Sequence, residues 1–246
     1  MNILSVESTS TPASVAIISD GRVLGEFTLN IANTHSEKLM PLIDNLLSCT
    51  SMSLKDIDAF AISVGPGSFT GIRIGLSAVK MMAVAGEKPL IGVSVLEALA
   101  YNVASFGDVV IPIINARNET VYTSIYESVL NDNGNSTLCE ISEAEAIKID
   151  VLCSKISELV QSGKKVALCG DGIYAYVDSI REKLMEYKDV WGNVSFAGER
   201  SRMPNAVNTG LIAFDRISQG KVTYAEDVEP FYIREAQATQ KLMNKN

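Results

Sequence analysis

Residues 65–75 read Gly-Pro-Gly-Ser-Phe-Thr-Gly-Ile-Arg-Ile-Gly, and this stretch decides how the chain is expected to fold. An apolar run, residues 59–64, leads into it, and a helix-like run, residues 72–85, follows it. The glycines allow a tight turn between a strand and a helix. Because backbone N–H groups at the start of a helix attract anions, the pattern fits a structural turn and also a phosphate cradle. The spacing matches neither G-x-x-x-x-G-K-S/T nor G-x-G-x-x-G, so both interpretations stay open.

The composition narrows the class of protein. With 246 residues, 47% of them hydrophobic, the chain is long enough for one large domain or two smaller ones. The formal net charge of −8 argues against independent binding to nucleic-acid phosphates. The four cysteines form no C-x-x-C pair, as expected for reduced thiols. His35 is the only histidine, which excludes sites that need two imidazoles.

The N-terminus carries no sign of a targeting segment. It reads Met-Asn-Ile-Leu-Ser-Val-Glu, without the basic residues that open a signal peptide. No apolar run reaches the roughly 18 to 20 residues that span a bilayer. We therefore expect a cytoplasmic protein with no membrane partner.

The order of the predicted elements repeats along the chain. The first half reads as strands 2–6, 14–18 and 23–29, helix 35–48, strand 59–64 and helix 72–85. The second half reads as strands 109–114, 121–126 and 137–141, a helical region 142–162, strand 165–169 and helix 173–187. A repeat of this length predicts an α/β protein of two related β-β-β-α-β-α domains. We place them at 1–104 and 105–246, and leave open whether the final helix, about 204–219, packs back on the first.

Two groups of residues at predicted strand ends are candidates for a nucleotide site. The segment from Glu7 to Thr11 offers a carboxylate and four hydroxyl groups, which suits a Mg²⁺–phosphate site or a polar hairpin that satisfies its own backbone. In the second half, a Gly-Asp-Gly turn and an asparagine also follow strands, and their pattern is equally ambiguous. The candidate nucleotide residues are Glu7, Thr9, Asn115, Gly170 and Gly172.

Two predicted helices carry an apolar surface that indicates a docking face. Helix 35–48 has apolar residues at the i, i+3, i+4, i+7 spacing, and helix 72–85 is apolar nearly all round. The surplus of apolar surface predicts a second packing partner, with burial inside the domain as the alternative. The expected contacts are Leu39, Leu42, Ile43, Leu46, Arg73, Ile74, Ser77, Ala78, Lys80 and Met81.

Five motifs occur together in this chain. They are Val-Glu-Ser-Thr-Ser at 6–10, His-Ser-Glu-x-Leu-x-Pro at 35–41, the glycine-rich stretch at 65–73, Gly-Val-Ser-Val-Leu-Glu-Ala-Leu-Ala at 92–100 and Pro-Phe-Tyr-Ile-Arg at 230–234. Together they resemble the TsaB family, also called YeaZ. The resemblance extends over nearly the full chain. It implies the actin-like (sugar kinase, heat-shock ATPase) fold with two domains, in agreement with the duplication.

The resemblance also implies a function. Members of the family take part in attaching threonylcarbamoyl to the adenosine beside the tRNA anticodon, as non-catalytic partners of the transferase TsaD, their paralogue, together with the ATPase TsaE. TsaD binds metal through an H-x-x-x-H pair, and the matching residues here, Val95 and Leu99, cannot ligate a metal. We therefore expect no catalytic residue and no metal, tRNA contact only through the complex, and a homodimer in isolation.

Two departures from the family pattern bear on nucleotide binding. Glu7 and Asn115 stand where the family usually or often has aspartate, at the positions that actin-like ATPases use for Mg²⁺ and water. The expected cofactor is thus none, beyond weak or vestigial ATP or ADP binding. One alternative is an autonomous actin-like ATPase or phosphotransferase that uses Glu7, Thr9 and Asn115. The other is a glycoprotease-like peptidase, which His35 alone supports poorly.

Overall fold

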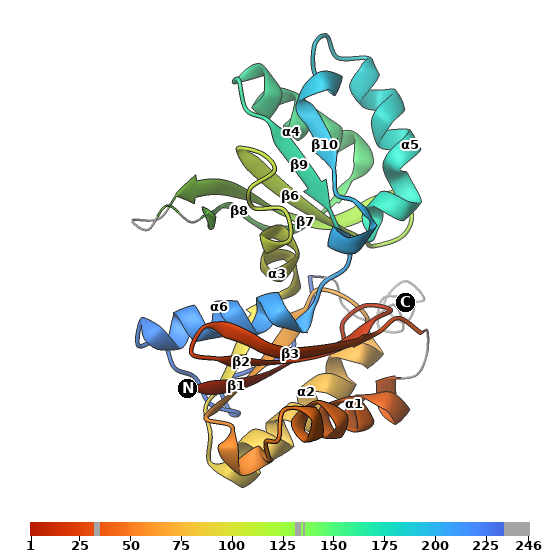
Figure 1. Cartoon of the computed structure of the whole chain (residues 1–246). Coiled ribbons are helices and arrows are strands. Elements are labelled where there is room, and N and C mark those ends of the chain that lie inside the picture. Colours follow the sequence, from red (N-terminus) through yellow and green to blue (C-terminus); the bar gives the residue numbers. More distant parts are fainter. Residues whose placement is uncertain (32–34, 131–133, 135, 234–246) are drawn as a thin grey trace. The chain divides into compact units, whose positions relative to one another are not determined.

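The structure is a computed structural model that describes residues 1–31, 35–130, 134 and 136–233, with His35 described by its backbone only. It divides into two compact units, shown in Figure 1. The first comprises Met1–Ala98 and the chain from Pro204 onward, and the second comprises Leu99–Met203. These boundaries differ from the expected 1–104 and 105–246, because the chain returns to the first unit at Pro204.

The first unit is built on a five-stranded sheet with strand order β3-β2-β1-β4-β5. Its strands are β1 (Asn2–Glu7), β2 (Ala13–Ser19), β3 (Arg22–Leu29), β4 (Ala59–Gly65) and β5 (Leu90–Ser94). The first three form an antiparallel meander, and β4 and β5 add to β1 in parallel. Helices α1 (His35–Cys49) and α2 (Phe69–Gly86) lie on one face of this sheet, as Figure 1 shows. A short 3-10 turn, Leu54–Asp56, precedes β4.

Helix α6 (Ala206–Ser218) covers the other face of the first sheet and contacts β1, β2 and β4. It begins at an Asn205 cap, whose side chain accepts a hydrogen bond from the Asn208 N–H. Arg216 near its end pairs with Glu97 at 2.5 Å and donates to the Gly92 carbonyl at 2.7 Å. These contacts fasten the last helix to the first unit.

The second unit repeats the same arrangement, with strand order β10-β9-β6-β7-β8. Its strands are β6 (Val109–Asn115), β7 (Thr120–Leu130), β8 (Ser136–Lys148), β9 (Val166–Cys169) and β10 (Val194–Phe196). Its helices are α4 (Ile149–Gln161) and α5 (Gly172–Met185), while α3 (Val95–Tyr101) spans the boundary between the units. Short 3-10 turns lie at Trp191–Asn193 and Glu199–Ser201. The predicted duplication and α/β class are confirmed.

The prediction of a helical region over residues 142–162 is partly wrong. Strand β8 continues to Lys148, and α4 begins only at Ile149. Residues 145–148 pair in antiparallel register with β7, for example Ile147 with Val121. The cross-strand pairing of side chains therefore outweighs the helix-start pattern in the local sequence.

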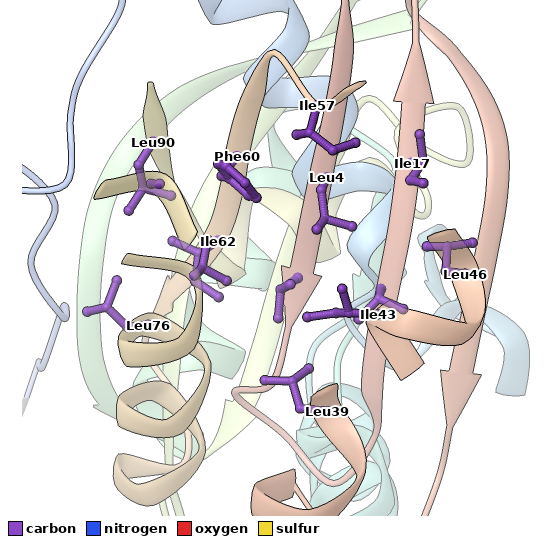
Figure 2. Packing of buried hydrophobic residues seen from close by; sticks show 14 of the residues in the cluster. Leu4, Ile17, Leu39, Ile43, Leu46, Ile57, Phe60, Ile62, Leu76 and Leu90 are labelled. Atoms are coloured by element: carbon purple, nitrogen blue, oxygen red, sulfur yellow. The ribbon is translucent and has the colours of Figure 1, made fainter. Parts of the chain in front are cut away.

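The core of the first unit lies between its sheet and helices α1 and α2 (Figure 2). Leucine, isoleucine, valine and phenylalanine side chains dominate it. The sheet contributes Leu4, Ile17, Phe60, Ile62 and Leu90, α1 contributes Leu39, Ile43 and Leu46, and α2 contributes Leu76 and Val79. Fully burying each such side chain stabilises the fold by about 1.5 to 3 kcal/mol before the entropy cost of ordering.

Candidate functional site

The glycine-rich stretch forms the predicted turn between β4 and α2, and the chain itself fills the space beside it. Ser68 caps α2, because its hydroxyl accepts from the Gly71 N–H at 3.2 Å. The Ser68 N–H donates to the Thr9 carbonyl at 2.6 Å. A β-carbon on Gly67 would overlap that carbonyl, and one on Gly71 would overlap the Ser8 carbonyl. The glycines thus let the β1–β2 loop approach closely, which favours the structural turn over the phosphate cradle.

Several polar groups of the β1–β2 loop are hydrogen-bonded inside the first unit, whereas the buried Ser10 hydroxyl has no partner among the described residues. Glu7 is fully buried, and its Oε1 accepts from the Thr9 N–H at 2.6 Å and the Thr9 hydroxyl at 2.5 Å. The Ser8 hydroxyl donates to the Gly71 carbonyl at 2.9 Å. Two of the candidate nucleotide residues are therefore engaged with each other inside the first unit, as the polar-hairpin interpretation expects.

The other candidate nucleotide residues lie together at the ends of β6 and β9 in the second unit. The Asn115 N–H donates to Asp171 Oδ1 at 2.9 Å, and the Asn115 side-chain oxygen accepts from the Tyr176 hydroxyl at 3.0 Å. Gly170 has φ +104°, and a β-carbon there would overlap the Ile113 carbonyl. A β-carbon on Gly172 would lie 2.9 Å from the same carbonyl oxygen, a less severe overlap. Contact with β6 thus accounts for both glycines without a nucleotide.

The half-buried carboxyl of Asp171 lies at this turn, between β9 and α5. Burial raises the pKa of Asp171 above its usual value, although backbone N–H donors from Asn115 and Gly172 favour the charged form. The carboxylate is turned to the backbone of its own unit. Hydrogen bonds and backbone contacts within each unit thus account for these residues and for the glycines of the first unit without a bound phosphate.

Helix α2 presents one exposed face, here called the outer face of α2. Its residues recur at helical spacing: Phe69, Arg73, Ser77, Met81 and Val84. Met81 is 74% exposed and Val84 is 64% exposed, so this face carries two large exposed apolar side chains about one helical turn apart. The opposite side of α2, including Ile72 and Val79, is buried.

The remaining contacts expected on α2 lie at the border of its outer face. Ile74, Ala78 and Lys80 are half-buried, and the first two pack against the core. By length and composition, α2 is the one helix in the described part of the chain that would suit a membrane span, and a third of it is buried. Its inner side is committed to the sheet, so the apolar composition serves a core on one side and an exposed face on the other.

Three of the residues expected to contact a partner belong to the core instead. Leu39, Ile43 and Leu46 are each 1% exposed, and Figure 2 shows them directed at the strands. The stripe that periodicity identified on α1 is the one that covers the sheet, so these three predictions are wrong. Leu42 is half-buried, and Met40, off the centre of the stripe, is 42% exposed.

The C-terminal Pro-Phe-Tyr-Ile-Arg motif, which the sequence linked to the family but to no site, adjoins the outer face of α2. The Phe231 N–H donates to the Val64 carbonyl at 2.8 Å. The Tyr232 ring lies 4.9 Å from the Phe69 ring, and the Tyr232 hydroxyl accepts from Arg73 Nε at 3.3 Å. Two adjacent aromatic residues so late in the chain were the available signal. The arginine of the motif, Arg234, lies outside the described residues.

The positions that the family resemblance matches to a metal-binding pair are apolar and buried. Val95 is 1% exposed and Leu99 is not exposed, four residues apart on α3. Among the described residues, no three or more histidine, cysteine, aspartate and glutamate side chains are grouped so as to hold a metal.

Comparison with known proteins places the chain in a family. The model of the family described as TsaD, tRNA N6-adenosine threonylcarbamoyltransferase, matches residues 22–236. An Escherichia coli protein named tRNA threonylcarbamoyladenosine biosynthesis protein TsaB is 32% identical over the full length of both chains. This chain belongs to the TsaB (YeaZ) family. The resemblance stated from the motifs is confirmed.

Solved structures agree with this assignment. A Pseudomonas aeruginosa structure, described as an uncharacterized protein with similarity to peptidase YeaZ, superposes with a TM-score of 0.76 at 25% identity. The comparison covers 95% of this TsaB-family chain and 99% of that one. The ROK hexokinase from Thermus thermophilus, with a TM-score of 0.50 at 10% identity over 89% of this chain and 100% of that one, shares the fold alone. The actin-like fold is confirmed.

Proposed function

We propose that this chain is a non-catalytic subunit of the assembly that makes tRNA threonylcarbamoyladenosine, and that it binds and activates the transferase TsaD together with TsaE. The similarity to E. coli TsaB along the whole chain carries the proposal. The assembly acts in the cytoplasm, where its tRNA substrate is. With a net charge of −8, the chain meets tRNA only through the complex.

The outer face of α2 is the proposed docking site for TsaD. Its exposed Met81 and Val84 would leave water on binding, which favours association by about 25 cal/mol per Å² of apolar surface. The transferase family model matches residues 22–236, which include α1 and α2, so TsaD is expected to present related helices. Two related faces of this kind can pack about a pseudo-twofold axis, and in isolation the same face would pair two copies of this chain.

Several contacts support a subunit role over catalysis by this chain. Val95 and Leu99 offer no ligand atoms where the resemblance places the metal-binding pair. In the first unit, the Glu7 carboxylate accepts hydrogen bonds from Thr9, and the glycine-rich turn packs against the backbone of the β1–β2 loop. The autonomous ATPase or phosphotransferase alternative and the peptidase alternative are therefore less well supported. The proposed role needs no cofactor bound to this chain.

Reconstituted threonylcarbamoyl transfer to tRNA tests the proposal. The transferase and TsaE are assayed with and without this chain, and the chain is assayed alone. We expect this chain to raise the transfer rate and to be inactive alone. Transfer by this chain alone would contradict the proposal, and so would a transfer rate that is the same with and without this chain. Titration calorimetry with ATP distinguishes the alternative, since micromolar Mg²⁺-dependent binding would favour an ATPase.

A further inference from the structure

We propose that Arg73, held by Phe69 and Tyr232, is the residue through which the outer face of α2 recognises a carboxylate on its partner. The inference rests on the proposed function, because the partner is the transferase TsaD. It assigns a charged anchor to a face whose other exposed residues are uncharged: Phe69, Ser77, Met81 and Val84.

The side chain of Arg73 is exposed but fixed. Its guanidinium carbon lies 3.8 Å from the centroid of the Phe69 ring, a cation–π contact. Its Nε donates to the Tyr232 hydroxyl at 3.3 Å, and the Tyr232 ring packs on Phe69. The terminal nitrogens make no hydrogen bond or ion pair to any other residue that the structure describes. They are left as a planar pair of donors, the geometry that binds a carboxylate through two hydrogen bonds.

Tyr232 is itself anchored by the segment that leads to it. Thr223 forms two hydrogen bonds with Leu90 of β5. The Leu90 N–H donates to the Thr223 carbonyl at 3.0 Å, and the Thr223 hydroxyl donates to the Leu90 carbonyl at 2.5 Å. Val228 is buried in the core of the first unit, and the Phe231 N–H bonds to the end of β4. The arginine is thus supported from outside its own helix. Holding it in place before binding reduces the conformational entropy lost in the complex.

The charge of α2 points to an acidic group on the partner. Between Phe69 and Gly86 the helix carries Arg73 and Lys80 and no acidic residue, in a chain whose net charge is −8. A protein carboxylate fits better than a nucleic-acid phosphate, because two of the three exposed residues that follow Arg73 along this face, Met81 and Val84, are apolar and the third, Ser77, is uncharged. Apolar anchors beside an arginine are typical of the energetic centre of protein interfaces.

The test is the dissociation constant of this chain for purified TsaD, measured by titration calorimetry at low and high salt. We expect Arg73→Gln to weaken binding by about 10- to 100-fold, and Arg73→Lys to weaken it less. Tyr232→Phe should weaken binding by a few-fold, because it removes only the hydroxyl that orients Arg73. The matched control is Arg181→Gln, an exposed arginine whose guanidinium lies over Trp191 on the second unit, and it should bind as the wild type does.

A second readout separates the charge from packing. Wild-type affinity should fall with added salt, and the Arg73→Gln protein should show a weaker salt dependence. Circular dichroism establishes that each variant is folded. Glu235→Gln tests whether a carboxylate of this chain itself contributes to binding. Glu235, outside the described residues, is the acidic residue next in sequence after Tyr232. We expect it to bind as the wild type does.

The outcomes distinguish this inference from the proposed function. If the wild-type chain does not bind TsaD, the proposed function fails. If the wild type binds and Arg73→Gln binds equally well, only the assignment of Arg73 is overturned. The assignment is also overturned if Glu235→Gln reproduces the loss, or if Arg73→Gln weakens only self-association or only tRNA binding.

Discussion

The carbonyl oxygen of Phe231 occupies the space that a β-carbon on Gly65 would need. The adjacent hydrogen bond, from the Phe231 N–H to the Val64 carbonyl, is 2.8 Å long. The glycine-rich turn and the C-terminal aromatic motif, distant in sequence, therefore pack directly on each other. The contact also directs the next residue, Tyr232, to Phe69 and Arg73, which links the turn to the outer face of α2.

Gly65→Ala should destabilise the first unit. Gly65 has φ +122°, which a side chain tolerates poorly, and the new methyl group would press on the backbone of Phe231. We expect a loss of about 1 to 3 kcal/mol in the free energy of unfolding, measured by urea denaturation. The control is Gly163→Ala, where φ is +88° but no atom lies within 4 Å, and the loss should be smaller. Equal losses would show that the Phe231 contact has no energetic weight.

The two sides of the helical layer should respond differently to truncation. Leu39→Ala removes a core side chain of α1 and should cost about 2 to 5 kcal/mol of unfolding free energy. Met81→Ala removes an exposed side chain and should change stability by less than about 0.5 kcal/mol. Chemical denaturation of the monomer measures both. A large loss for Met81→Ala would mean that this side chain belongs to the core.

Asp171 should give the second unit a pH-dependent stability. Burial raises the pKa of this carboxyl in the folded protein above its usual value of 3.8. The folded state therefore favours the neutral carboxyl. The contribution of Asp171 to folding stability is fully present below its pKa in the unfolded chain, and it is lost as the pH rises through its pKa in the folded protein. Asp171→Asn keeps an acceptor for the Asn115 N–H but does not ionise.

The stability of Asp171→Asn relative to the wild type should accordingly increase as the pH rises from about 4 toward neutrality. Urea denaturation of both proteins across this range measures the difference. Asp178→Asn, an exposed position on α5, controls for the loss of a surface carboxylate. A difference that stays constant or decreases with pH would contradict the account.

The sequence predicted the order of elements well and the direction of one helical face poorly. Periodicity identified which residues of α1 share a face, among them Leu39 and Ile43, but it does not tell whether that face meets a sheet or a partner. The end of β8 was misassigned because its pairing with β7 depends on residues far away in sequence. The contact between Tyr232 and Arg73 could not be predicted, because a local sequence pattern does not indicate which distant segment of the chain packs on a helix.

The candidate nucleotide residues illustrate the same limit. A glycine required by the approach of another backbone, such as Gly170 beside Ile113, has the same local signature as a glycine that admits a phosphate. Only the tertiary contact separates the two. The family, in contrast, was recognisable from the sequence because five motifs occur in one chain.

Light scattering of the mixed proteins after size-exclusion chromatography tests most directly whether this chain docks TsaD through the outer face of α2. We predict a complex whose mass is that of the two chains together, and its loss with Met81→Glu, which would place an unpaired charge in the interface while leaving this chain folded. A complex that forms equally well with folded Met81→Glu, or a wild-type chain that elutes apart from TsaD, would contradict the account.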